Sequence, residues 1–287
     1  MSLTQVIQRQ EVRDAFRANA IKERTPKAIR SCPLLVPPTT KLYGIVGHAF
    51  DYLARIHLRR KLEGSAVTVL DYGWFAEHEK HRLEWHCVRK QDYKFWVASL
   101  SRAKTAAQRY QEGDDNLLQM SQYCQLLANV EILARSGRFD PDFRPHVDIS
   151  NELIQMIEIL DRQEEFCPET LCVLNPRFEA ASLVGGADAD LVLDDRLIDF
   201  KTASRPIVRL EYQLQLAAYT ALQRKAGLEG VPPEQQPEFR KVELYFARFG
   251  ILLSWSLEEL FPDGGFDRFC TAFDAELGDE DGGVLFE

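Results

Sequence analysis

Two aspartates and a lysine stand close together in segment 185–202, in a pattern that could bind a divalent cation. Asp190 precedes the apolar run LVL, and Asp199 and Lys201 are two residues apart in LIDFK. Because side chains alternate along a strand, Asp199 and Lys201 share one face and Phe200 points to the other. The DDR turn between the runs predicts an antiparallel hairpin that brings Asp190 near Asp199. Two close carboxylates repel unless a cation lies between them, so the pattern predicts a metal site.

Such a site would support metal-assisted hydrolysis of a phosphodiester. Mg2+ or Mn2+ binds oxygen ligands, typically one or two carboxylates together with water and substrate phosphate. Asp190, Asp199 and the backbone carbonyl of Phe200 would hold the ion, which lowers the pKa of a bound water. Lys201 could orient or deprotonate that water. Asp188 shares the face of Asp190 and could exchange roles with it, and an exposed hairpin with a surface ion pair is the simpler alternative.

The order of these motifs resembles that of the RecB-like branch of the PD-(D/E)xK nuclease superfamily. The sequence reads GADADLVL, three further residues, LIDFKT, and then YQLQLAAY on the next predicted helix. The resemblance implies five catalytic positions, which are Asp190, Asp199, Lys201, Gln215 and Tyr219. Gln215 and Tyr219 are four residues apart and so lie on one helix face, which Tyr212 extends. In the family this face lines the DNA-binding groove.

A second polar stripe lies on the predicted helix upstream, where four side chains recur at helical spacing: His48, Asp51, Arg55 and Arg59. A solvated helix face is the ordinary explanation of such a stripe. The resemblance implies instead that this helix supplies a further metal ligand, His48 or Asp51, and contacts to the substrate. Glu179, in the predicted strand before Asp190, is a competing metal ligand. The predicted contacts to nucleic acid are Arg55, Arg59 and Tyr212.

The cysteines and histidines give no sign of a further metal centre. Six cysteines are scattered along the chain without a CxxC pair, so we expect reduced thiols. Some RecB-like nucleases hold an iron-sulfur cluster with one upstream cysteine and a downstream trio; this sequence has no such trio, and we predict no iron-sulfur cluster. The run EHEKHRLEWHC contains His78, His81, His86 and Cys87 at a spacing that matches no closed zinc site, so we predict no zinc.

Charge is distributed unevenly along the chain, which has a formal net charge of -9. Residues 1–61 contain 12 Lys and Arg against 4 Asp and Glu, whereas the rest contains 23 against 40. A basic segment on an acidic body is typical of a local contact with nucleic acid, and a solvated basic helix is the alternative. We expect DNA as the partner, with RNA as the alternative. A protein partner, or assembly with a second copy of the chain, is compatible with the sequence. No apolar run reaches the roughly 18 residues of a membrane span and no secretory signal is present, so a cytoplasmic protein without a membrane partner is expected.

Hydrophobic periodicity divides the chain into a helical part and a later part rich in strands. Helices are predicted over 5–24, 43–62, 91–111, 115–136, 149–165, 209–225 and 265–276, with an irregular proline-rich stretch at 25–40. Strands are predicted over 177–184, 187–193 and 196–201, which form a meander, and over 242–249 and 251–256. The region from 63 to 165 reads as all helix, and the acidic end at 278–287 reads as loose.

These elements predict an α/β protein with a restriction-endonuclease-like core, a mixed central sheet flanked by helices, and a helical insertion. The expected division is a basic N-terminal helix and proline-rich loop at 1–42, a nuclease core at 43–62 and 166–287, and the insertion at 63–165. The expected function is metal-dependent hydrolysis of nucleic acid. The alternatives are a non-catalytic nucleic-acid-binding or assembly subunit of the same fold, and a hydrolase or binding module for a small phosphorylated ligand.

Overall fold

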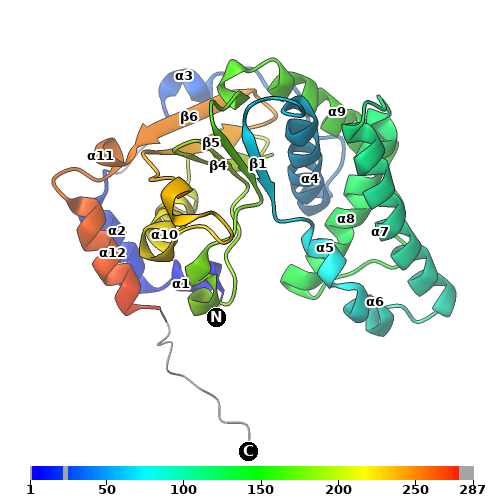
Figure 1. Cartoon of the computed structure of the whole chain (residues 1–287), viewed down its shortest axis with the longest axis horizontal. Helices are drawn as coiled ribbons and strands as arrows, with labels where there is room; N and C mark the ends of the chain where they lie inside the picture. The colour runs from blue at the N-terminus through cyan, green and yellow to red at the C-terminus, as the bar shows by residue number, and fades with distance from the viewer. Residues whose placement is uncertain (1, 22–24, 278–287) are drawn as a thin grey trace, which may run out of the picture.

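A mixed sheet of six strands runs through the centre of the described part of the protein (Figure 1). The computed structural model describes residues 2–21 and 25–277. The strands lie side by side in chain order and are β1 (Thr68–Asp71), β2 (Leu171–Leu174), β3 (Leu191–Leu193), β4 (Arg196–Lys201), β5 (Lys241–Phe246) and β6 (Ile251–Ser256). β1 is parallel to β2 and β4 to β5, and the other neighbours are antiparallel. The fold is therefore α/β with an open mixed sheet.

Helices cover both faces of the sheet. On one side, residues of α4 (Tyr43–Lys61), α7 (Lys90–Gln111), α8 (Leu117–Ser136) and α9 (Val147–Asp161) share a hydrophobic core with the sheet. On the other side, residues of α2 (Gln10–Asn19), α10 (Leu210–Ala226) and α12 (Gly265–Ala275) share a second core with it (Figure 1). The apolar residues of β4 alternate between the two layers: Ile198 and Phe200 join the α4 side, and Leu197 joins the α10 side. Because both faces are buried, the strands read as continuous apolar runs.

Short helical segments connect these elements. They are α1 (Leu3–Val6), α3 (Lys27–Arg30), α5 (Phe75–His78), α6 (Lys80–His86), α11 (Leu257–Leu260) and the 3-10 helices η1 (Glu164–Phe166), η2 (Glu179–Val184) and η3 (Pro233–Gln235). Within residues 2–21 and 25–277, no helix combines the length and apolarity that a membrane crossing requires.

The long helices and the last three strands begin and end close to the predicted residues. The N-terminal helix predicted over 5–24 is instead two helices, α1 and α2, because α1 packs against α10 and α2 packs against α12. The proline-rich stretch is irregular apart from the single turn α3. The predicted loose end at 278–287 lies outside the described residues.

Two features of the sheet contradict the predictions. The middle region is not all helix, since β1 extends the sheet through parallel pairing with β2. The strand predicted over 177–184 is largely η2, and β2 takes its place beside β3. Asn175 has a φ of 54° and Pro176 follows it, which ends β2. Phe178 then stacks on Tyr219 with ring centres 5.4 Å apart, so the segment packs against α10 rather than pairing in the sheet.

Candidate functional site

A cavity of about 270 Å3 opens where the end of β4 meets α4, α8 and α10, and we call it the hairpin cavity. Its lining residues are Gly44, Gly47, His48, Asp51, Glu131, Arg135, Asp188, Asp190, Asp199, Phe200, Lys201, Gln215 and Tyr219. All five residues predicted to be catalytic are among them. His48 and Asp51 of α4 join them, so the first two residues of the stripe on that helix line the same cavity, and Arg55 and Arg59 do not.

The hairpin of β3 and β4 sets the positions of the two central carboxylates. Leu191 pairs with Ile198, so Asp190 and Asp199 take the next positions of the ladder, at its open end. Oδ2 of Asp190 accepts a hydrogen bond of 2.5 Å from the backbone N–H of Phe200. The two aspartates are thus held on adjacent backbone segments, as the turn between the strands predicts.

Lys201 forms an ion pair with Asp199 of the same strand. Its ammonium also lies 4.5 Å from the centre of the Tyr212 ring, within the range of a cation–π contact. Burial alone would lower the pKa of Lys201, but the charges of Asp199 and Asp190 outweigh it and raise that pKa. Lys201 is therefore a cation that is held against the carboxylates.

Three carboxyl groups of the cavity have pKa values above their usual range. Burial, followed by the charges of Asp199 and Asp51, holds the pKa of Asp190 well above its usual range. Burial raises the pKa of Asp51 to about 6, against the opposing charge of Arg55. Burial also raises the pKa of Asp199, although Lys201 opposes the rise. A cation bound among these groups would favour their charged forms.

Two cavity residues that the sequence did not predict come from α8. Oε1 of Glu131 lies 3.3 Å from Nδ1 of His48 and 2.6 Å from Nε of Arg135, while Oε2 has no hydrogen-bond partner among the described residues. Burial would raise the pKa of Glu131, but the His48 contact and the Arg135 charge lower it. The available signal was a lone Glu in the apolar helix LLQMSQYCQLLANVEILARS, since such a residue is rarely buried without a partner.

The helix face predicted from Gln215 and Tyr219 holds the chain that precedes β3. Gln215 donates a 2.9 Å hydrogen bond to the Tyr219 hydroxyl, which donates at 2.6 Å to the backbone carbonyl of Asp188. The carboxylate of Asp188 pairs with Arg135. Asp188 is thus committed to this ion pair, and Asp190 is the aspartate that faces Asp199.

Glu179, the competing metal ligand, lies away from the hairpin cavity. It is exposed in η2 and lines a separate cavity beside Pro232 and Pro233. The structure does not bring Glu179 together with Asp190, because the strand that would have carried it there does not form.

The residues predicted to contact nucleic acid have other partners. Arg55 is only 5% exposed, and its guanidinium bonds to Asp51 and to the backbone carbonyl of Gly73. A contact of Arg55 with nucleic acid stays a prediction. Arg59 is half-exposed but pairs with Asp71 at 2.9 Å, outside the cavity lining. Tyr212 is partly buried beneath Lys201, and a contact of its ring with nucleic acid stays a prediction.

The donor set fits a hard divalent cation in part. Within residues 2–21 and 25–277, no group of three or more His, Cys, Asp and Glu side chains is arranged to hold a metal ion. Mg2+ is satisfied by one or two carboxylates when water and substrate oxygens complete its shell. Asp190 and Asp199 supply two carboxylates, and a buried oxygen of Asp51 that lacks a hydrogen-bond partner in the described chain lies in the same lining.

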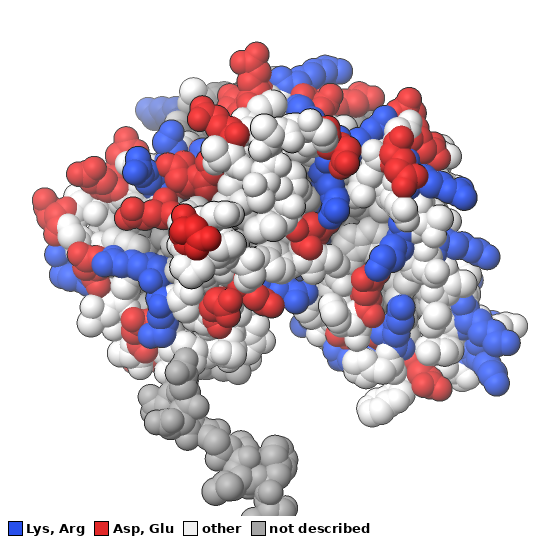
Figure 2. Space-filling model, in the orientation of Figure 1, with Lys and Arg blue, Asp and Glu red and all other residues white. Residues whose placement is uncertain are grey.

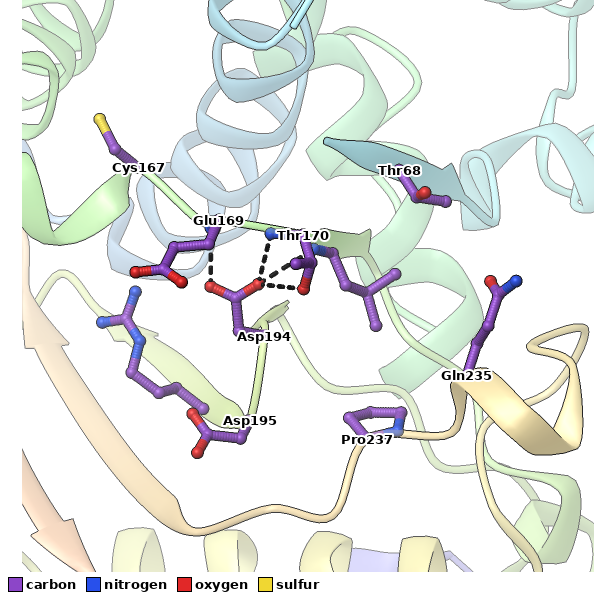
Figure 3. Close-up of a pocket in the computed structure, with 10 residues that line it drawn as sticks. Thr68, Cys167, Glu169, Thr170, Asp194, Asp195, Gln235 and Pro237 are labelled. Atoms are coloured by element: carbon purple, nitrogen blue, oxygen red, sulfur yellow. Dashed lines mark hydrogen bonds between the residues drawn. The ribbon is translucent and has the colours of Figure 1, made fainter. Parts of the chain in front are cut away.

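A larger cavity, of about 740 Å3, lies at the other end of the hairpin and contains no predicted site residue (Figure 3). The carboxylate of Asp194 in its lining is already paired. Asp194 in the hairpin turn accepts hydrogen bonds from the backbone N–H groups of Glu169, Thr170 and Leu171. These hydrogen bonds anchor the hairpin turn, and the predicted site residues lie at the opposite end of the hairpin.

Comparison with known proteins adds no relative to these observations. No protein-family model, no curated protein and no solved structure matches the chain.

Proposed function

We propose that this chain is a divalent-metal-dependent nuclease that hydrolyses phosphodiester bonds of DNA, on a restriction-endonuclease-like core of the PD-(D/E)xK type. The observation that carries the proposal is the hairpin that holds Asp190 beside Asp199, with Lys201 paired to Asp199. Burial of two neighbouring carboxylates destabilises a fold unless a cation compensates them. A metal site is therefore the function that best accounts for their position.

Each part of the cavity has a role in this reaction. Asp190, Asp199 and the backbone carbonyl of Phe200 would hold Mg2+ or Mn2+, which supplies Lewis acidity toward the phosphate and lowers the pKa of a bound water. Lys201 places a positive charge beside them, where it stabilises charge that develops on the phosphate in the transition state. Glu131 fixes Nδ1 of His48, which leaves Nε2 for a ligand or the substrate.

Cleavage of labelled single- and double-stranded DNA and RNA in Mg2+ or Mn2+ tests the proposal. The wild type should cut DNA and stop when EDTA removes the metal. Lys201→Ala should cut at least about 100-fold more slowly, because a charge aimed at the transition state is lost, while its DNA binding persists. The matched control is Lys241→Ala, which removes an exposed lysine from the neighbouring strand β5 and should cut at the wild-type rate.

A nucleic-acid-binding or assembly subunit that keeps the same fold is the second candidate. It is favoured by one observation, that fewer than three side-chain ligands converge in the described part of the chain. Binding of nucleic acid by the wild type without cutting in either metal would overturn the nuclease proposal in favour of this one.

A further inference from the structure

Two large apolar side chains stand almost fully in solvent where α6 leads into α7. Trp85 is 87% exposed and Val88 is 98% exposed. Their neighbours Leu83 and Cys87 are buried in the core on the α4 side, so the backbone beneath the exposed side chains is anchored. The exposed indole is therefore held in a fixed place where an aromatic ligand can stack on it.

The same region is basic, in contrast to the chain as a whole. Residues 80–109 contain eight Lys and Arg against two Asp and Glu, while the whole chain has a net charge of -9. Lys80, Lys90 and Lys94 are exposed and form no ion pair with any other described residue. Figure 2 shows Lys and Arg side chains gathered at the lower right, over α6 and α7. We call Trp85, Val88 and these three lysines the α6–α7 surface. Its charge is complementary to a polyanion.

A second cavity lies beside the hairpin cavity, next to α5. This cavity, of about 340 Å3, lies between α5 and the chain that precedes β3, and Asp188 lines both cavities. Arg135 of the hairpin cavity lies 5.5 Å from the ring of Phe75, which lines the second cavity. Arg82 of α6 donates at 3.4 Å to the backbone carbonyl of Ala134, the residue before Arg135. A strand that leaves the hairpin cavity past Asp188 would therefore meet α5 and then α6.

We propose that the α6–α7 surface binds single-stranded nucleic acid, with an unpaired base stacked on Trp85 and phosphates at Lys80, Lys90 and Lys94. The inference rests on the proposed function, because the strand it holds is the substrate of the hairpin cavity. Stacking on a single indole requires a base that is free of its complement, and it tolerates any sequence because every base has a π-face. Three exposed lysines on the same α6–α7 segment as the indole match a phosphate backbone better than an apolar protein partner.

Fluorescence anisotropy with a labelled oligothymidylate tests the inference on the full chain, with EDTA present to prevent cleavage. Trp85→Ala should weaken binding about 5- to 100-fold, the effect of losing one base stack, and Trp85→Phe should restore most of the affinity. The matched control is Val147→Ala, which removes a 59% exposed apolar side chain from α9 and should bind as the wild type. Equal thermal midpoints of the variants would show that each is folded.

A second measurement separates charge from stacking. The double variant Lys90→Gln/Lys94→Gln should reduce the slope of log affinity against log salt by about 1.4, since each phosphate contact on a single strand contributes about 0.7. The control Lys225→Gln/Lys241→Gln removes two lysines that lie outside the α6–α7 surface, one in α10 and one in β5. It should leave the slope of log affinity against log salt unchanged.

The outcomes for the two proposals are distinguishable. If the wild type cuts DNA but the Trp85 and lysine variants bind as the wild type does, the α6–α7 inference is overturned and the nuclease proposal stands. If the wild type cuts nothing but Trp85→Ala loses single-strand binding, the nuclease proposal fails and the surface remains a nucleic-acid site. Preferential binding of duplex DNA that is insensitive to Trp85→Ala also overturns the inference.

Discussion

Replacement of Asp194 by alanine should lower the free energy of unfolding by about 2–3 kcal/mol. The carboxylate accepts hydrogen bonds from the backbone N–H groups of Glu169, Thr170 and Leu171, at 2.9, 2.8 and 3.0 Å, and from the Thr170 hydroxyl at 2.8 Å. Each bond to a charged group stabilises by about 1.5–3 kcal/mol when buried. The site is partly exposed, so we assign about 0.5–0.7 kcal/mol to each of the four bonds.

The contribution of Asp194 depends on pH with a definite sign. Burial would raise its pKa, but the hydrogen bonds from Glu169, Leu171 and Thr170 outweigh burial and lower the pKa below its usual value. A carboxyl group with a depressed folded-state pKa stabilises the fold above its unfolded pKa of about 3.9 and loses this effect as the pH falls through the folded value. The difference between wild type and variant should therefore be constant from about pH 7 to pH 5 and shrink below about pH 4.

Urea unfolding followed by circular dichroism at pH 7 and at pH 3 measures this difference. Asp195→Ala is the matched control, because its exposed carboxylate lies 3.9 Å from Arg240 and should contribute less than about 0.5 kcal/mol. Equal losses in the two variants, or a difference for Asp194→Ala that is the same at both pH values, would refute the reasoning.

Two further substitutions address the hairpin cavity. Asp190→Asn should raise the thermal midpoint of the metal-free protein at pH 7 by about 2–4 °C and weaken Mn2+ binding at least about tenfold, and calorimetry measures both. The folded-state pKa of Asp190 is raised, so ionisation of this carboxyl group above its unfolded pKa destabilises the fold, and asparagine cannot ionise. A lowered midpoint with unchanged metal affinity would contradict this assignment. Glu131→Gln should lower the free energy of unfolding in urea by about 1 kcal/mol, because it weakens the ion pair between buried Glu131 and exposed Arg135, whereas the exposed Glu158→Gln on α9 should change it little. Similar unfolding curves for the two glutamate variants would argue against a buried network at α8.

The segment predicted as a helical insertion contributes directly to the sheet and to the candidate site. It contains β1, which pairs with β2, and it supplies Glu131 and Arg135 to the hairpin cavity. Arg135 also holds Asp188, beside the aspartate that we assign to the metal. The chemistry of the cavity therefore depends on α8 as well as on the hairpin.

The sequence by itself determined the local part of the site. Asp190, Asp199 and Lys201 are joined by one tight turn, and side-chain alternation along a strand is enough to predict which of them meet. The spacing of Gln215 and Tyr219 placed them on one helix face for the same kind of reason, since four residues make about one turn. These rules act over a few residues and do not depend on what else the chain packs against.

Only the tertiary structure decided which distant elements join that local part. The periodicity of α8 shows that it is buried, but no pattern within a helix states that it meets α4 and so brings Glu131 to His48. Glu179 does not line the hairpin cavity, because its neighbour Phe178 stacks on Tyr219, a residue more than thirty positions away in the chain. The sequence near Glu179 does not encode this long-range contact. β1 was missed because four residues carry too little pattern to identify a strand, and its pairing with β2 spans the whole helical segment.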